Sequence, residues 1–296
     1  MRKFLLTTAA FGVLGLPAMA ADLAPVYKAP AAVSACMWCG FYVGLNAGGT
    51  WSNDNSVVNS GLVNDFLAAP GSYGATSAAG ASGSVPSGNR SGFIGGGQIG
   101  YNWQISSAWL VGFEDDIQGI SGNGNGTLGN RTPVGGFFGN PDVVTTSITS
   151  TNKLDYLGTV RGRLGYLFTP AFLVYGTGGL AYGGVKASTA ITQSNNDCSF
   201  TPVACIQSAT AAGGALSQTL AGWTAGAGLE WLFARQWSAK VEYLHYDLGS
   251  VTFANGSLVT GNGTFAPAGG PAIVNSATST QFRGDIVRAG VNLHWY

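Results

Sequence analysis

Hydrophobic and polar residues alternate along much of the chain, in segments of about ten to fifteen residues. In Gln98–Ile105 every odd position is apolar or aromatic, and every even position carries Gln, Gly or Asn. Such a period of two is typical of a β-strand with one apolar and one polar face. The pattern predicts eight strands: Phe41–Asn53, Ser91–Ile105, Ala108–Ile120, Lys153–Phe168, Phe172–Lys186, Thr219–Phe233, Trp237–Gly249 and Gln281–Tyr296.

The connections between these strands are alternately very short and very long. Ser106-Ser107, Thr169–Ala171 and Ala234–Gln236 fit tight turns. The long connections are rich in Gly, Ser, Asn and Thr, and we expect them to be loops without regular structure; they are Asp54–Arg90, Ser121–Asn152, Ala187–Gln218 and Ser250–Thr280. An even number of strands with this asymmetry predicts an all-β protein, a single eight-stranded antiparallel transmembrane barrel with short periplasmic turns and long extracellular loops.

Alternation alone does not say which face of the wall is outside, because a soluble barrel would turn its apolar face inward. In Leu154–Phe168 the even positions, from Leu154 to Phe168, form the apolar face, and Asp155, Arg161 and Arg163 lie on the other. The first 20 residues favour the membrane barrel. Arg2 and Lys3 precede an apolar run and a small-residue cleavage site, which together indicate a secretory signal peptide. The expected divisions are therefore a signal peptide at 1–20, a periplasmic segment at 21–40 and the barrel at 41–296.

Composition excludes several other classes of protein. Only 9% of the 296 residues are charged, against about 25% in soluble domains, and 13 basic residues balance 13 acidic ones. A nucleic-acid partner would need a basic face. Beyond the signal no apolar run approaches the roughly 20 residues of a transmembrane helix.

Aromatic residues gather at the turn ends of the predicted strands, as in the girdle at a membrane–water boundary. We expect this girdle to comprise Trp103, Trp109, Phe168, Phe172, Trp231, Phe233, Trp237 and Trp295. A looser second set, for the outer boundary, consists of Trp51, Tyr156, Tyr182, Trp223 and Tyr243.

With the apolar face outside, charged residues of the opposite parity point into the barrel. They fall at similar height and are nearly balanced, so we expect a buried ion-pair network, because an unpaired buried charge costs several kcal/mol. Its members are Glu114, Asp116, Arg161, Arg163, Glu230, Lys240, Glu242 and Arg288. Asp115 would face lipid, unless it lies at the outer rim or a bulge shifts the parity.

The four cysteines form two close pairs, Cys36 with Cys39 and Cys198 with Cys205, which in an exported protein are candidate disulfides. The C-x-x-C spacing of the first pair also occurs in redox and metal sites. However, there is no second C-x-x-C, and His245 and His294 are the only histidines. We therefore expect no metal and no cofactor.

The glycines of Gly95–Gly100 match the G-x-G-x-x-G of a dinucleotide-binding loop. In that fold a helix opens at the last glycine, whereas here Tyr101–Ile105 continue the strand alternation. Similar glycine runs recur at Gly176–Gly179 and Gly226–Gly228. The glycines fit a tightly curved barrel wall better than a nucleotide site.

Several of these segments resemble the small outer-membrane immunogenic proteins of alphaproteobacteria, also called porin-family proteins, which have an OmpA-like eight-stranded barrel. The segments that carry the resemblance are "ADLAPVYKAP" (Ala21–Pro30), "MWCGFYVGLNAGG" (Met37–Gly49), "GGGQIGYNWQ" (Gly95–Gln104), "LVGFEDDIQG" (Leu110–Gly119), "LGTVRGRLGY" (Leu157–Tyr166), "GLEWLFARQWSAKVEYLHYDLG" (Gly228–Gly249) and "DIVRAGVNLHWY" (Asp285–Tyr296). The family usually has Ser or Thr where Cys39 stands. The resemblance implies a surface-exposed envelope protein without catalytic residues.

The function expected first is a structural and surface-exposed role in the outer membrane, as an antigen or interaction protein. A small passive pore for ions or solutes is the alternative, and a lipid-modifying enzyme a remote one. Expected partners are outer-membrane lipid and lipopolysaccharide, the barrel-assembly machinery during insertion, and extracellular ligands that the sequence does not identify. We expect no nucleic-acid partner, and a monomer rather than a trimer.

Overall fold

The computed structural model describes residues 36–52, 56–63, 73–86, 91–134, 142–197, 206–260 and 272–295. The expected signal peptide and most of the periplasmic segment lie outside these ranges. Cys198 and Cys205 also lie outside them, so the disulfide expected between these two cysteines stays a prediction. No helix in the described ranges is long and apolar enough to cross a membrane.

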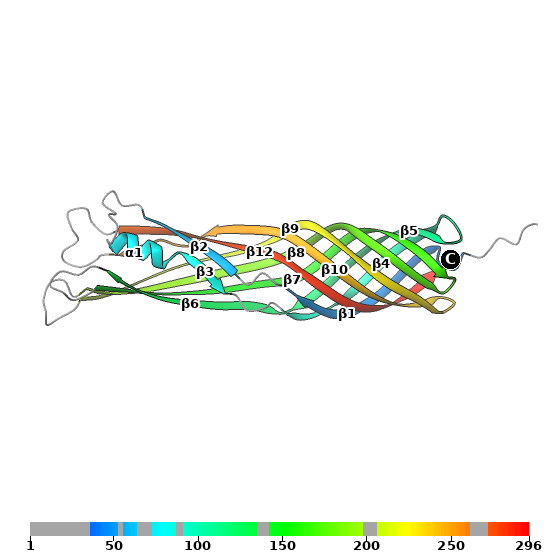
Figure 1. The fold of residues 1–296 in the computed structure, drawn as a ribbon, viewed down its shortest axis with the longest axis horizontal. Helices are drawn as coiled ribbons and strands as arrows, with labels where there is room; N and C mark the ends of the chain where they lie inside the picture. Colours follow the sequence, from blue (N-terminus) through cyan, green and yellow to red (C-terminus); the bar gives the residue numbers. More distant parts are fainter. Residues whose placement is uncertain are drawn as a thin grey trace, which may run out of the picture. The chain divides into compact units, whose positions relative to one another are not determined.

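Eight strands form one antiparallel sheet that closes on itself, as the alternation predicts. Each strand pairs with the next in the order β1-β4-β5-β7-β8-β9-β10-β12, and β12 pairs back to β1. All the short turns lie at one end, and the long connections lie at the other (Figure 1). The strands are β1 (Gly40–Trp51), β4 (Gly92–Gln104), β5 (Trp109–Ser121), β7 (Asp142–Thr169), β8 (Phe172–Asp197), β9 (Ile206–Ala234), β10 (Trp237–Ala254) and β12 (Ala272–Trp295).

The expectation that the long connections lack regular structure is wrong. Strands β7, β8, β9 and β12 run well past the predicted limits, and the connections add β2 (Ser56–Val63), α1 (Tyr73–Gly80), β3 (Gly83–Pro86), β6 (Asn123–Val134) and β11 (Leu258–Thr260). Strand β6 pairs with β7, β2 and β11 pair with β12, and β3 pairs with β2. Ser- and Thr-rich sequence is therefore held in a sheet because neighbouring strands satisfy its backbone hydrogen bonds.

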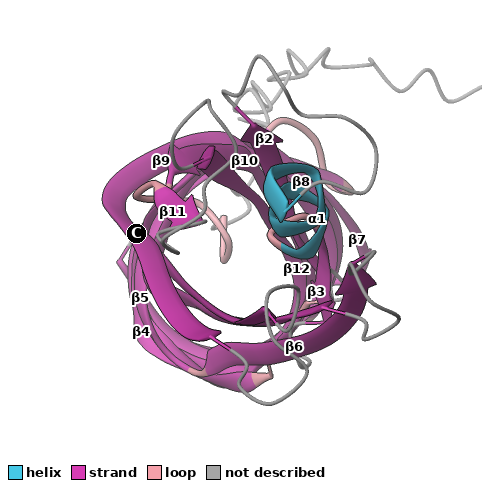
Figure 2. Ribbon diagram, turned by 90° about the vertical axis from the view of Figure 1, so that its left-hand side faces the viewer, coloured by secondary structure: helices cyan, strands magenta, loops and turns pink. Residues whose placement is uncertain are grey.

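The wall thus has two tiers. The lower tier comprises β1, β4, β5 and residues 155–184, 219–249 and 282–295. The upper tier comprises β2, β3, β6, β11 and residues 142–154, 185–197, 206–218, 250–254 and 272–281. Viewed from the loop end, α1 lies inside the ring of strands (Figure 2).

Two β-bulges mark the junction of the tiers. The register shifts between Leu154 and Tyr156 on β7 and between Asp247 and Ser250 on β10, where Gly249 has a φ of 80°. Each extra residue reverses which positions face inward. The prediction that Leu154 shares the outer face with Phe168 is therefore wrong, since Leu154 is buried in the interior.

The register of β5 against β4 and β7 is unbroken at Asp115, which pairs with Ile99 and Val160. No bulge shifts its parity, so Asp115 lies on the outer wall between Phe113 and Ile117.

Large apolar side chains cover the outside of the lower tier, which is the reverse of a soluble barrel. Leu45 is 75% exposed and Ile117, Leu229 and Val241 are each more than half exposed, whereas Arg161, Lys240 and Arg288 are buried inside. Such a surface suits hydrocarbon and is far larger than a soluble protein tolerates.

The glycine-rich segment of β4 fits its neighbours closely on one face only. A Cβ on Gly96 would lie 2.0 Å from the carbonyl oxygen of Ile117, and one on Gly100 would lie 2.3 Å from the ring of Tyr42. A Cβ on Gly97, which faces outward, would meet its nearest atom at 3.7 Å. Alternate glycines therefore make room for the barrel interior, and no helix follows them.

We predict that Gly96→Val destabilises the barrel whereas Gly97→Val does not. The valine at 96 must displace backbone, which costs about 1–3 kcal/mol, but the valine at 97 extends into the surrounding apolar phase. The check is the temperature at which each purified variant loses its compact, fast-migrating gel band. Equal midpoints for the two variants would contradict this account of the glycine run.

Candidate functional site in the barrel interior and at its rims

The structure brings all eight sequence-predicted interior charges together in the lower tier. Each side chain is at most 3% exposed. They come from five strands, β5, β7, β9, β10 and β12, and face one another because every one lies at an inward parity. Four of them are basic and four are acidic, so the set is formally neutral. The bases are Arg161, Arg163, Lys240 and Arg288, and the acids are Glu114, Asp116, Glu230 and Glu242.

Arg161 holds the centre of this network. Its Nη2 lies 2.5 Å from Glu114 Oε1 and 2.7 Å from Asp116 Oδ2, and its Nη1 lies 2.9 Å from Glu242 Oε1. Its Nε donates to Thr159 Oγ1 at 2.8 Å. The planar guanidinium, with donors on three sides, serves three carboxylates at once.

Arg288 and Lys240 close the network around the same acids. Arg288 Nη2 lies 2.8 Å from Asp116 Oδ2 and 2.5 Å from Glu242 Oε2. Lys240 Nζ donates to both oxygens of Glu114, at 2.9 and 3.0 Å. Each of these acids therefore meets at least two bases, which offsets the cost of burying the charges.

Arg163 forms the second centre, nearer the turns. Its Nη2 lies 2.6 Å from Glu230 Oε2, and its Nη1 donates to the Tyr42 hydroxyl at 2.9 Å. That hydroxyl donates in turn to Glu114 Oε2 at 2.7 Å, which joins the two centres. The guanidinium also lies 4.2 Å from the ring centroid of Tyr175, a cation–π distance.

Sequence reasoning missed the uncharged members of the network. Gln98 Nε2 donates to Asn292 Oδ1 at 2.5 Å, and Asn292 Nδ2 donates to Glu230 Oε1 at 2.7 Å. Tyr175 donates to Glu242 Oε1 at 3.1 Å. The signal was present in the parity, because these residues alternate with outward-facing apolar ones, as Asn292 does with Val291.

Trp38 occupies the mouth of the barrel at the turn end. It is 1% exposed, packs with Leu110, Leu167 and Leu173, and donates from Nε1 to the Pro170 carbonyl at 2.9 Å. The turn that carries it is closed by a disulfide between Cys36 and Cys39, with a Cα–Cα distance of 5.4 Å. A short turn closed by a disulfide therefore places the Trp38 indole on the turn side of the charge network.

Of the two disulfides that the sequence predicts, the structure forms the one between Cys36 and Cys39. The other, between Cys198 and Cys205, would lie in the connection between β8 and β9, outside the described residues. The pairing of Cys198 with Cys205 therefore stays a prediction.

The interior above the network is filled as well. An apolar cluster that includes Leu157, Leu244, Phe282 and Ile286 lies around the tier junction. In the upper tier a further cluster packs Ala78 and Ala81, at the end of α1, against Ile148 and Ile191. The α1 serine Ser77 also bonds the side chain of Gln193 on β8. Helix α1 thus fills the outer end.

All eight predicted girdle residues are exposed at the turn end of the wall. Their exposed fractions run from 41% for Phe172 to 55% for Phe168. Neighbouring rings stack. The ring centroid of Phe172 lies 5.7 Å from that of Phe168 and 5.9 Å from that of Trp231. At the other edge of the apolar band Trp51, Trp223 and Tyr243 are exposed.

The two histidines lie at opposite ends of the lower tier. His294 is buried beneath Tyr42 and beside Trp38, and its Nε2 lies 2.9 Å from Ser238 Oγ and 3.5 Å from Glu230 Oε1. His245 lies on the outer wall, with its Nδ1 2.8 Å from Asp285 Oδ1, which also accepts the Tyr243 hydroxyl at 2.6 Å. Within the described ranges no group of three or more His, Cys, Asp and Glu is arranged to hold a metal ion.

Comparison with known proteins identifies the family to which this barrel belongs. Residues 6–266 match the family described as outer membrane protein beta-barrel domain. The chain belongs to the outer-membrane β-barrel family. The 31 kDa outer-membrane immunogenic protein of Brucella melitensis is 34% identical over 235 residues, which are 78% of this chain and 81% of the relative. The 22 kDa outer membrane protein of Rhizobium leguminosarum is 32% identical over 170 residues, 54% of this chain and 59% of the relative.

Among solved structures, the outer membrane protein OprG from Pseudomonas aeruginosa is 11% identical, with a TM-score of 0.34 over 87% of this chain and 97% of OprG. Ail of Yersinia pestis, 11% identical, has a TM-score of 0.29 over 84% of this chain and 98% of Ail. Family membership itself rests on the sequence matches, and it places this β-barrel in the outer membrane.

Arg161→Ala is predicted to destabilise the barrel strongly. It leaves Glu114, Asp116 and Glu242 short of a shared partner, and the loss of one member of a buried charge set costs about 3–5 kcal/mol. The heat-induced shift in gel mobility should occur at a clearly lower temperature. Arg235→Ala, in the exposed turn after β9, is the matched control and should leave the shift in place. An unchanged melt for Arg161→Ala would exclude a stabilising network.

Trp38→Ala should also lower the unfolding temperature, because it removes a buried indole and its hydrogen bond to Pro170, at about 3–5 kcal/mol. Met37→Ala, next to it and 39% exposed, should have little effect. If both variants melt alike, the indole does not seal the mouth.

Proposed function

We propose that this outer-membrane barrel is a sealed wall element that stabilises the membrane and presents its upper tier to the surroundings, rather than a pore or an enzyme. The observation that carries the proposal is the filled interior. Four layers follow one another along the barrel axis from the turn end: Trp38, the neutral charge network, the apolar cluster at the tier junction, and α1.

The charge network argues against conduction on physical grounds. An ion passing the level of Arg161 would have to separate contacts of 2.5–2.9 Å between fully buried charges. Breaking such contacts leaves charges unpaired in a low dielectric, which costs several kcal/mol for each. An eight-stranded barrel is only just wide enough for its own side chains to fill it.

The histidines give no support to catalysis. Ser238, His294 and Glu230 have the residue types of a catalytic triad, but all three are at most 1% exposed. The Ser238 hydroxyl donates to Glu230 at 2.5 Å, so its proton is not directed to the imidazole, as a nucleophilic serine would require. His245 bonds Asp285 and packs 5.4 Å from the Trp223 ring, which fits an anchor at the edge of the apolar band.

The expected result is that the purified full chain, reconstituted in planar bilayers, gives no discrete current steps. A general porin inserted under the same conditions is the positive control for reconstitution. Folded insertion is verified by the heat-shifted gel band of the same sample. Reproducible openings from a correctly folded sample would overturn the sealed-wall proposal and favour the small passive pore.

A further inference from the structure

The outer wall of β7, β8 and β9 changes its chemistry abruptly where the two tiers meet. Below the junction it carries large apolar side chains, and the last aromatics on β7 and β8 are Tyr156 and Tyr182. A short way further up, Lys153 on β7 stands directly opposite Lys186 on β8. Both lysines face outward, with side chains 43% and 57% exposed.

Two like charges opposite each other in a ladder repel, and here only one carboxylate lies between them. Asp155 Oδ1 is 2.9 Å from Lys153 Nζ, and its Oδ2 is 2.7 Å from Lys186 Nζ. The three groups together carry a net positive charge. Because lysine stems lie along apolar surface while their ammonium groups reach the polar boundary, this charge is held at headgroup level.

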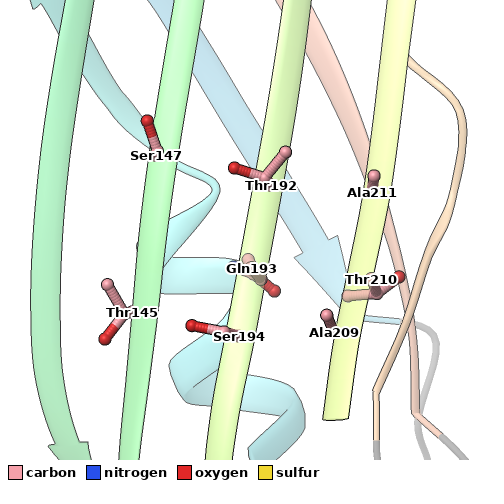
Figure 3. Close-up of a pocket in the computed structure, with 8 residues that line it drawn as sticks. All are labelled: Thr145, Ser147, Thr192, Gln193, Ser194, Ala209, Thr210 and Ala211. Carbon is pink, nitrogen blue, oxygen red and sulfur yellow. The ribbon is translucent and has the colours of Figure 1, made fainter.

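Above the lysines the same three strands form a depression of about 330 Å³. Figure 3 shows its lining, in which short side chains from neighbouring strands stand side by side. Five of the lining residues carry hydroxyls, namely Thr145, Ser147, Thr192, Ser194 and Thr210, and the small side chains of Ala209 and Ala211 leave the floor open on β9. Ser147 pairs with Thr192, and Thr192 pairs with Ala211, so the hydroxyls form a regular array.

The two features are aligned along the strands. Eight residues separate Lys153 from Thr145, a rise of about 26 Å at roughly 3.3 Å per residue. A ligand that uses both must have an apolar part beside the lower tier, a phosphate at the boundary and a hydroxyl-rich part above it. A free phosphate or a soluble sugar meets only one of these requirements.

We propose that the outer wall of β7–β9 binds a phosphorylated glycolipid of the outer leaflet, with its phosphate at Lys153 and Lys186 and its sugars along the Ser/Thr depression. The proposal rests on the proposed function in that it takes the upper tier to lie outside the membrane. It adds a ligand class and a site to that function.

The first test measures the affinity of the detergent-solubilised full chain for rough-type lipopolysaccharide that carries lipid A phosphates and a core oligosaccharide. Lys186→Gln should weaken binding about tenfold, since it removes a charge-assisted contact. Arg235→Gln, which removes the same charge at the opposite end of the wall, should have no effect. Asp155→Asn should tighten binding. Equal affinities for Lys186→Gln and Arg235→Gln would overturn the phosphate site.

The second test separates the sugar from the lipid. Thr145→Val combined with Thr192→Val keeps the side-chain shape and removes two hydroxyls. This double variant should lose affinity for the core-bearing glycolipid and keep it for lipid A without core sugars. Unchanged binding of both glycolipids would overturn the role of the depression. Wild-type affinity for phosphatidylglycerol equal to that for the glycolipid would overturn the ligand class.

Each variant is first checked for the compact unheated gel band, so a folding defect is recognised before binding is measured. The outcome is also independent of the conductance test, since a barrel that conducts can still bind a glycolipid on its outer wall. Failure of the sealed-wall proposal and failure of the glycolipid site are therefore distinguishable.

Discussion

Charge neutrality inside the lower tier is the constraint on which the remaining features depend. Lipid surrounds the wall, so the apolar side chains must point outward and the polar ones must share a narrow interior. Four bases placed there are tolerable only with four acids at contact distance. Arg161 on β7 is joined to β5 through Glu114 and Asp116 and to β10 through Glu242. The network therefore fixes the register of these strands and also fills the barrel interior.

This constraint also explains the glycines and tyrosines of the wall. Long charged side chains reach the axis only if neighbouring inward positions are small. A Cβ on Gly112 would lie 2.9 Å from Arg163 Cγ, and one on Gly290 would lie 3.5 Å from Lys240 Cε. Tyr42 lies over Gly100, and Tyr175 lies over Gly228. Both tyrosines carry hydroxyls that bond the network at Glu114 and Glu242. A glycine in one strand thus lets an aromatic ring in the next satisfy a buried carboxylate.

Much of the lower tier is predictable because one rule governs it. The period of two gives all eight strands, and parity gives the inward charges, since lipid on one side and a crowded interior on the other leave no third place for a side chain. The same rule fails at Leu154, because the bulge at Asp155 adds one residue that hydrophobicity does not report. The upper tier escaped prediction for a related reason. Its outward positions carry small Ser, Thr and Ala residues, so no alternation of hydrophobicity results.

The two bulges give the change of environment a structural basis. On β7 and β10 the inward parity reverses at the junction, whereas on β8 and β12 it continues. On β7 and β10 the interior of the upper tier is therefore lined by positions that would have faced outward had the strands run on unbroken, such as Leu154 and Val251. On β7 that exchange also turns Ile148 inward, into the cluster that packs against the end of α1. On β7 it also leaves Lys153, Thr145 and Ser147 on the outside of the wall. A strand that crosses from hydrocarbon to water can thus keep its hydrogen-bond ladder and still change both of its faces.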